Sequence, residues 1–111
     1  MKARKLDHRV AFDREVLVPD GRGGQNRTWQ ELTTCWAEFR YQRGKEAMEA
    51  GALTGSATWK VRVRASSQLL NLTTACRMRD VRQGISFNIR EIDPISDPGN
   101  IWLSVESGVA I

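Results

Sequence analysis

Apolar and polar residues alternate most clearly between residues 34 and 42 of this sequence. Every second residue there is apolar, and polar residues occupy most of the positions between them. Successive side chains of a β-strand point to opposite faces of a sheet, so the pattern predicts a strand with one buried face. Trp36 interrupts its polar side. The apolar side consists of Cys35, Ala37, Phe39 and Tyr41.

The segment that follows, residues 43–56, shows no clear alternation. It is rich in charged residues and contains three glycines, at positions 44, 51 and 55. We expect an irregular and flexible excursion here. One or two helical turns are predicted over residues 46–50, ending at Gly51, because glycine commonly follows the last residue of a helix.

The same alternation predicts further strands along the chain. A long strand covers residues 8–18, and a short one covers residues 27–32, before a tight corner at residues 33–34. Residues 57–65 form the cleanest strand, with one apolar face and one polar, cationic face. Shorter strands are predicted over residues 75–81, 85–92 and 101–105.

Two irregularities are expected in the second half of the chain. Ile92 is out of phase with Phe87 and Ile89, and a β-bulge near Arg90 and Glu91 would return it to the apolar face. The polar loop at residues 66–74 contains three leucines, which is compatible with a turn of helix. Gln83 and Gly84 are typical of a hairpin turn.

Six or seven strands separated by turn residues, with one short helix and long loops, predict an all-β fold. This spacing is typical of a small antiparallel β-barrel or sandwich. A chain of 111 residues with no internal repeat or low-complexity linker is expected to form a single domain over residues 1–111.

Composition narrows the function only slightly. The formal net charge of +4 suits an acidic partner, either nucleic acid or an acidic protein surface, although many small proteins are mildly basic. Two cysteines are too few for a disulfide framework, and Cys35 and Cys76 are expected to be reduced and buried. No apolar run approaches the length of a membrane helix and no secretory signal is present, so we expect a soluble, intracellular product.

No constellation of catalytic residues stands out. His8 is the single histidine and lies near the chain end, so a zinc site lacks ligands. Gly21-Arg22-Gly23-Gly24 has neither the lysine nor the hydroxyl residue of a phosphate-binding P-loop. We therefore expect no catalytic residues, no metal, no cofactor and no small-molecule substrate, and we do not expect an enzyme.

Cationic residues give two strands a polar face. Lys60, Arg62 and Arg64 alternate on one strand, and Arg77 and Arg79 alternate on another. If these strands are neighbours, the five side chains form one basic stripe. Arginine binds phosphates and carboxylates through the same planar set of donors, so the stripe would suit nucleic acid or a protein interface. A solvated outer face explains the same pattern.

Four tryptophans form the second notable group. Trp59 falls on the apolar side of its strand, whereas Trp36 and Trp102 fall on polar sides. Exposed indoles beside arginines are typical of protein interfaces, and they also stack on nucleobases in OB-like barrels. A register slip of one residue would instead place either indole inside.

Taken in order, these motifs resemble the phage head–tail joining proteins, also described as head-closure or stopper proteins of tailed bacteriophages and prophages. The resemblance covers nearly the whole chain, and its most specific part is the Trp-Ala-Glu strand followed by Gly-x-Glu. The long polar loop at residues 66–74 departs from many relatives. The matching segments are Leu6-x-x-Arg9-Val10-x-Phe12, Asp20-Gly21, Gly24, Thr28-Trp29, Trp36-Ala37-Glu38, Gly44-x-Glu46, Val61-Arg62-Val63-Arg64, Gly84-x-x-Phe87-x-Ile89, Asp93-Pro94 and Trp102-Leu103-x-Val105.

The resemblance implies a small β-barrel that assembles into a homo-oligomeric ring at the virion neck, made in the host cytoplasm before assembly. Such a ring lies between the portal or adaptor protein above and a tail protein below. It retains the packaged double-stranded DNA that passes through its channel and provides the platform for tail attachment. No catalysis and no membrane are involved.

Residue roles can be placed on this scheme as hypotheses. Contacts between subunits or with partners are assigned to Trp36, Arg62, Arg64 and Trp102. The excursion, with Arg43, Lys45, Glu46 and Glu49, is assigned to the channel or to a neighbouring ring. Two alternatives remain at this point: a tail-completion or tail-terminator ring, and an OB-like barrel that binds nucleic acid through Lys60, Arg62, Arg64, Arg77 and Arg79.

Overall fold

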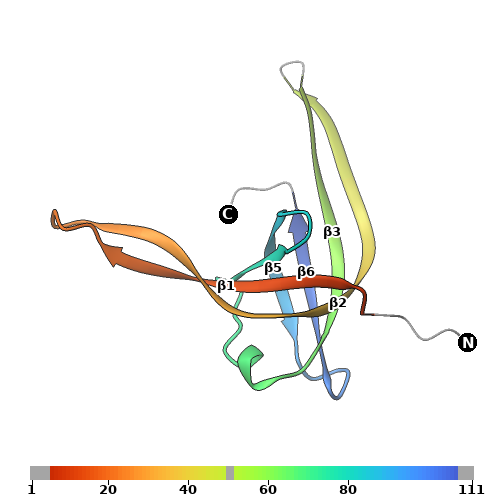
Figure 1. Cartoon of the computed structure of the whole chain (residues 1–111). Helices are drawn as coiled ribbons and strands as arrows, with labels where there is room; N and C mark the ends of the chain where they lie inside the picture. Colours follow the sequence, from red (N-terminus) through yellow and green to blue (C-terminus); the bar gives the residue numbers. More distant parts are fainter. Residues whose placement is uncertain (1–5, 50–51, 108–111) are drawn as a thin grey trace, which may run out of the picture.

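Six antiparallel strands form a closed barrel in the computed structural model, which describes residues 6–49 and 52–107 (Figure 1). Around the barrel the strands follow the order β1-β2-β3-β6-β5-β4. The predicted all-β barrel is therefore confirmed. The strands are β1 (His8–Pro19), β2 (Gln25–Glu49), β3 (Ala52–Arg64), β4 (Arg77–Asp80), β5 (Ser86–Asp93) and β6 (Asn100–Ser107).

Side chains on the inner face of the strands form the core. In β6 the burial alternates as predicted, with Ile101, Leu103 and Val105 inside the barrel. Phe12 and Met78 are fully buried and face them from β1 and β4. Burial of these side chains is the main favourable term in folding, at roughly 25 cal/mol for each Å² of apolar surface removed from water.

A β-bulge in β5 confirms one of the predicted irregularities. The register with β6 shifts between Ile89 and Glu91, so that Arg90 is the extra residue. Ile92 is thereby returned to the inner face, where it packs against the core. The hairpin turn near Gly84 is also confirmed, although it spans more than two residues: Asp80 and Ile85 are its hydrogen-bonded ends, and Gly84 adopts a φ of 74°.

β2 is a single strand of 25 residues, which corrects two predictions. There is no corner at residues 33–34, because a register shift opposite Phe12 and Asp13 bends the strand without ending it. There is no helix over residues 46–49 either, since these residues pair with β3. Pairing across the sheet outweighs the weak helical preference of glutamate, alanine and methionine. Ala50 and Gly51 lie outside the described residues.

Two hairpins extend well beyond the barrel. In the first arm, residues 14–30, β1 and β2 pair only with each other, because the pairing of β1 with β4 ends at Asp13. In the second arm, residues 45–49 of β2 pair with residues 52–56 of β3. Figure 1 shows the two arms leaving the barrel in different directions, and the molecule measures 59 × 44 × 24 Å. The segment predicted to be irregular is thus paired strand over residues 43–49 and 52–56.

The loop between β3 and β4 contains the predicted helical turn. It is a 3-10 helix, η1 (Ser67–Leu69), and Leu69 and Leu72 are buried in the core cluster. Because η1 is the one helical segment of the described residues, they contain no helix long and apolar enough to cross a membrane. Both cysteines are free, with Cys76 buried and Cys35 half-buried. Burial raises the pKa of the Cys35 thiol, so this group is protonated at neutral pH.

A buried carboxylate ties the first arm to the barrel. Asp13 is 2% exposed and accepts hydrogen bonds from Arg77 Nε (2.8 Å) and Arg79 Nε (3.2 Å). Arg79 also donates to Glu31 (3.0 Å), and Arg77 lies 4.4 Å from the centre of the Trp29 ring. Burial alone would raise the pKa of Asp13, but the hydrogen bonds and charges of Arg79 and Arg77 outweigh it and lower the pKa.

Replacing this carboxylate should destabilise the fold in a pH-dependent way. We expect Asp13→Asn to lower the free energy of unfolding at pH 7 by about 3 kcal/mol, because two arginines lose a buried partner. The lowered pKa in the folded state makes this contribution complete above about pH 4 and removes it as the pH falls further. Urea unfolding followed by circular dichroism at pH 7 and pH 3 should show the difference between wild type and variant narrowing at pH 3.

Glu15→Gln is the matched control, since Glu15 forms an exposed pair with Arg27 on the same arm. It should change stability much less than Asp13→Asn. Equal stability of Asp13→Asn and wild type at pH 7 would contradict the role given to this carboxylate.

Candidate interaction surface on the outer face of the barrel

One outer face of the barrel brings together cationic and aromatic side chains from four neighbouring strands. Its residues alternate with core residues, and the sheet register places them in rows: Arg9 opposite Trp36, Glu38 opposite Arg62, Arg62 opposite Trp102, and Arg40 opposite Lys60. We call this surface the basic face. It consists of Arg9, Trp36, Glu38, Arg40, Lys60, Arg62, Arg64 and Trp102.

Glu38 is the anchor of the basic face. It is 4% exposed, and its two oxygens accept hydrogen bonds from Arg40 Nε and Arg62 Nε, both at 2.8 Å. Burial alone would raise the pKa of Glu38, but the two arginines lower it overall, so the carboxylate is charged at neutral pH. Arg62 also donates to Asn100 Oδ1 at 3.2 Å. This network fixes both guanidinium groups and links β2, β3 and β6.

Trp102 lies on the outer face, as the alternation predicted, but the chain itself partly covers it. The Arg40 guanidinium lies 4.8 Å from the ring centre, and the indole Nε1 donates to Asp97 Oδ2 at 3.0 Å. Its polar group is satisfied and its ring is stacked by a cation. Trp102 therefore helps to hold the basic face in place.

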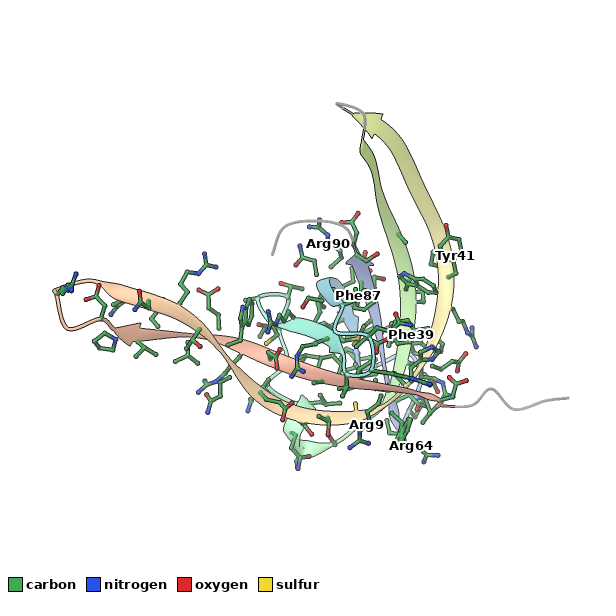
Figure 2. The ribbon with its side chains drawn as sticks, turned by 45° about the horizontal axis from the view of Figure 1, so that its top comes forward. Arg9, Phe39, Tyr41, Arg64, Phe87 and Arg90 are labelled. Atoms are coloured by element: carbon green, nitrogen blue, oxygen red, sulfur yellow. The ribbon has the colours of Figure 1, made fainter. Side chains whose placement is uncertain are left out.

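Trp36 is the more open of the two outward tryptophans, with 50% of its surface exposed. The guanidinium of Arg9 lies 5.3 Å from its ring centre and donates to Thr34 Oγ1 at 2.9 Å. Ala37 and Val63 are antiparallel partners. Trp36 precedes Ala37 and Arg64 follows Val63, so both lie at the same end of the barrel. Figure 2 shows Arg9 and Arg64 together at that end.

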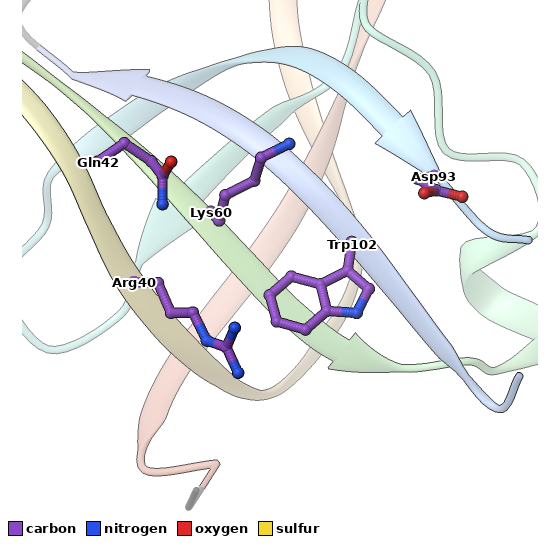
Figure 3. Close-up of a pocket in the computed structure, with 5 residues that line it drawn as sticks. All are labelled: Arg40, Gln42, Lys60, Asp93 and Trp102. Atoms are coloured by element: carbon purple, nitrogen blue, oxygen red, sulfur yellow. The ribbon is translucent and has the colours of Figure 1, made fainter. Parts of the chain in front are cut away.

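A shallow pocket lies beside Trp102 on the basic face. It measures about 300 Å³ and is lined by Arg40, Gln42, Lys60, Asp93 and Trp102 (Figure 3). Gln42 is the extra residue of a bulge in β2, where the register with β3 shifts between Tyr41 and Arg43. The Ser96 side chain, two backbone N–H groups and the charge of Lys60 lower the pKa of Asp93. Among the described residues, no three histidine, cysteine, aspartate or glutamate side chains gather to hold a metal ion.

The basic face concentrates positive charge. Its eight residues include five cations and one carboxylate, and two further carboxylates, Asp93 and Asp97, lie beside Trp102, so cations remain in excess. Arg9, Lys60 and Arg64 form no ion pair with any residue in the described part of the chain. Such a surface attracts an acidic partner and repels a basic one.

The predicted single basic stripe is wrong. β3 and β4 are not neighbours, because two strands separate them on either path around the barrel. Arg77 and Arg79 therefore lie on the opposite side from Lys60, Arg62 and Arg64. There they are neutralised by Asp13 and Glu31.

The four residues assigned to interfaces share the basic face, whereas the four assigned to the channel lie on another part of β2. Trp36, Arg62, Arg64 and Trp102 are brought together by the register of β2, β3 and β6. Arg9 was not assigned to an interface from the sequence. It precedes the apolar Val10 in an alternating strand, and this pattern predicts that its side chain faces outward. The residues Arg43, Lys45, Glu46 and Glu49 follow the Gln42 bulge and run into the second arm.

Tyr41 corrects one further prediction. Alternation predicts that its side chain is buried, but 57% of its surface is exposed, because β2 leaves the barrel at this point. Its ring packs edge-on against Trp59, with 5.0 Å between centres. Trp59 faces inward as predicted and packs against the core, where it also contacts Phe39.

Comparisons with known proteins identify one family and two solved structures with a similar fold. The model of a family described as "Phage head completion protein" matches residues 1–105. No curated protein sequence is similar enough to the chain to count as a relative. Among solved structures, a chain from the virion of a native gene transfer agent particle is similar, with 20% identity, a TM-score of 0.68 and full coverage of both chains. Protein SF1141 from Shigella flexneri 2a is similar with 16% identity, a TM-score of 0.67 and full coverage of both.

The anchoring role of Glu38 can be tested with a pair of identical substitutions. We expect Glu38→Gln to lower the free energy of unfolding by about 2 kcal/mol at pH 7, because Arg40 and Arg62 lose a buried carboxylate. Release of Arg40 from Trp102 should also increase quenching of tryptophan fluorescence by acrylamide. Urea unfolding and quenching measure the two effects.

Glu31→Gln removes an exposed carboxylate that binds one arginine, and it is expected to change stability by less than about 0.5 kcal/mol. If the two variants were equally stable, Glu38 would not be the anchor of this face.

Proposed function

The chain belongs to the phage head completion protein family, and on this premise we propose that it is a structural protein of the head–tail connector. In this role it closes the filled head and provides the platform for tail attachment. The observation that carries the proposal is the family match over residues 1–105, which includes both arms and all of the barrel except the last two residues of β6. The same family description favours the head side of the neck over a tail-terminator ring.

We further propose that copies of the chain assemble into a ring at the virion neck, after synthesis in the host cytoplasm. The ring lies between the portal or adaptor protein and a tail protein, and packaged double-stranded DNA passes through it. The two arms support this arrangement. Each is a two-stranded ribbon, and such ribbons are at best marginally stable in water until they pack against something else.

Contacts with neighbouring subunits or proteins are assigned to the basic face. Trp36 and Arg64 offer exposed surface for direct contact. Arg62 and Trp102 are held by Glu38, Asn100 and Asp97, so they support the same surface from beneath. Interfaces are enriched in tryptophan and arginine, which fits this assignment.

The second arm is assigned to the channel or to a neighbouring ring. It includes Lys45, Glu46 and Glu49, and Arg43 precedes it on the same continuous strand. The alternative of a nucleic-acid-binding barrel loses its main support, because Lys60, Arg62 and Arg64 are not beside Arg77 and Arg79.

Shortening the second arm tests its role. Replacing residues 46–55 by Asn-Gly joins Lys45 to Ser56, which are register partners, through a two-residue turn. The barrel should fold normally by circular dichroism, since the core lies elsewhere. Heads completed with this variant should lose packaged DNA or fail to join tails, which nuclease protection of DNA and electron microscopy of particles measure.

The control shortens the first arm in the same way, by replacing residues 20–24 with Asn-Gly between the register partners Pro19 and Gln25. It should leave DNA retention and tail joining close to wild type. Fully infectious particles containing the variant with the shortened second arm would rule out the assigned role.

A further inference from the structure

We propose that the basic face binds an acidic segment of a partner protein, with carboxylates opposite Arg9, Lys60 and Arg64 and one apolar side chain against Trp36. This inference rests on the proposed function, because it names the chemistry of a contact made during neck assembly. Nucleic acid is the competing ligand for any basic surface, and the arrangement of the face argues against it.

The charge on the face is not balanced within the chain. Glu38 binds Arg40 and Arg62, while Arg9, Lys60 and Arg64 form no ion pair with a described residue. The opposite side of the barrel is different, since Asp13 and Glu31 balance Arg77 and Arg79 there. Positive charge is therefore in excess on one side, which is where an acidic partner gains most.

The spacing of the cations suits an extended chain. Lys60, Arg62 and Arg64 alternate along β3, so successive side chains are about 7 Å apart. An extended peptide with a carboxylate at every second residue has the same repeat. Arg9 lies across β2 from β3, opposite Trp36, and widens the charged surface beyond one strand.

Trp36 distinguishes the two classes of ligand. Half of its surface is exposed, next to Arg9. In duplex DNA the bases are stacked inside, so a phosphate backbone lying on this face would leave the indole without an apolar partner. A protein segment can supply both a carboxylate for the arginines and an aliphatic side chain for the ring.

The face is already ordered before a partner arrives. Thr34 holds Arg9, Glu38 holds Arg40 and Arg62, and Asp97 holds Trp102. Fixing long side chains on binding has an entropic cost, and hydrogen bonds made in the free protein reduce that cost. This ordering favours a specific acidic ligand over loose attraction of any polyanion.

Binding of two probes to the full chain tests the proposal. The first is a fluorescently labelled peptide of alternating glutamate and threonine with one central leucine, and its control has glutamine in place of glutamate. The second is a short DNA duplex. Fluorescence anisotropy should show that the acidic peptide binds at least tenfold more tightly than the glutamine peptide and more tightly than the duplex. Added salt should weaken this binding.

Three variants locate the site. Arg64→Glu should weaken peptide binding about tenfold or more, because it reverses a charge on the face. Trp36→Ala should weaken it severalfold, through loss of the apolar contact. Arg22→Glu makes the same charge change in the exposed turn between β1 and β2, at the tip of the first arm and away from the face, and should bind the peptide as wild type does. Circular dichroism confirms that each variant is folded.

Several results would overturn the proposal. These are absence of peptide binding, equal effects of Arg64→Glu and Arg22→Glu, or tighter binding of the duplex that Trp36→Ala leaves unchanged. Each of them would leave the connector role intact. That role fails on a different observation, namely that purified virions lack the protein, whatever the peptide does.

Discussion

Continuous pairing of β2 with both of its neighbours is the constraint on which the rest of the structure depends. This one strand pairs with β1 through the first arm and into the barrel, and then with β3 through the barrel and into the second arm. A strand of 25 residues cannot keep one unbroken register through the first arm, the barrel and the second arm, because twist accumulates along it. The register shifts opposite Phe12 and at Gln42 resolve this, since each bulge bends the strand where an arm meets the barrel.

Two buried carboxylates stabilise opposite sides of this barrel by the same means, with different consequences for charge. Asp13 and Glu38 each accept hydrogen bonds from two arginines on neighbouring positions. Near Asp13, a second carboxylate brings the local charge to zero. Around Glu38, the three further cations Arg9, Lys60 and Arg64 form no ion pair with a described residue, and Asp93 lies near Lys60 alone, so the same kind of anchor lies at the centre of a positively charged face.

Local alternation predicted most strands but could not predict which strands are neighbours. β6 and the bulge in β5 were found because their apolar residues repeat every two positions, with one interruption at Ile92. The helix expected over residues 46–50 failed because its local preference is weak, and because residues 46–49 pair with residues 52–55, which show no clear alternation in the sequence. Local alternation also predicted that Trp36 and Arg64 point outward. It could not predict that Arg77 and Arg62 lie on opposite sides of the barrel. Strand order depends on closure of the whole barrel.

Closure of the barrel also separates two kinds of contact that this chain can make. Strand edges that pair on one side only lie along both arms, and also at residues 38–44 of β2 and 89–93 of β5. Backbone hydrogen bonds with other chains are available at these edges. Contacts that depend on side-chain chemistry are left to the outer face of the barrel, where Glu38 and Asp97 hold the arginines and Trp102 in place. In the proposed role, the arms extend along a neighbour while side chains of the outer face determine which neighbour is accepted.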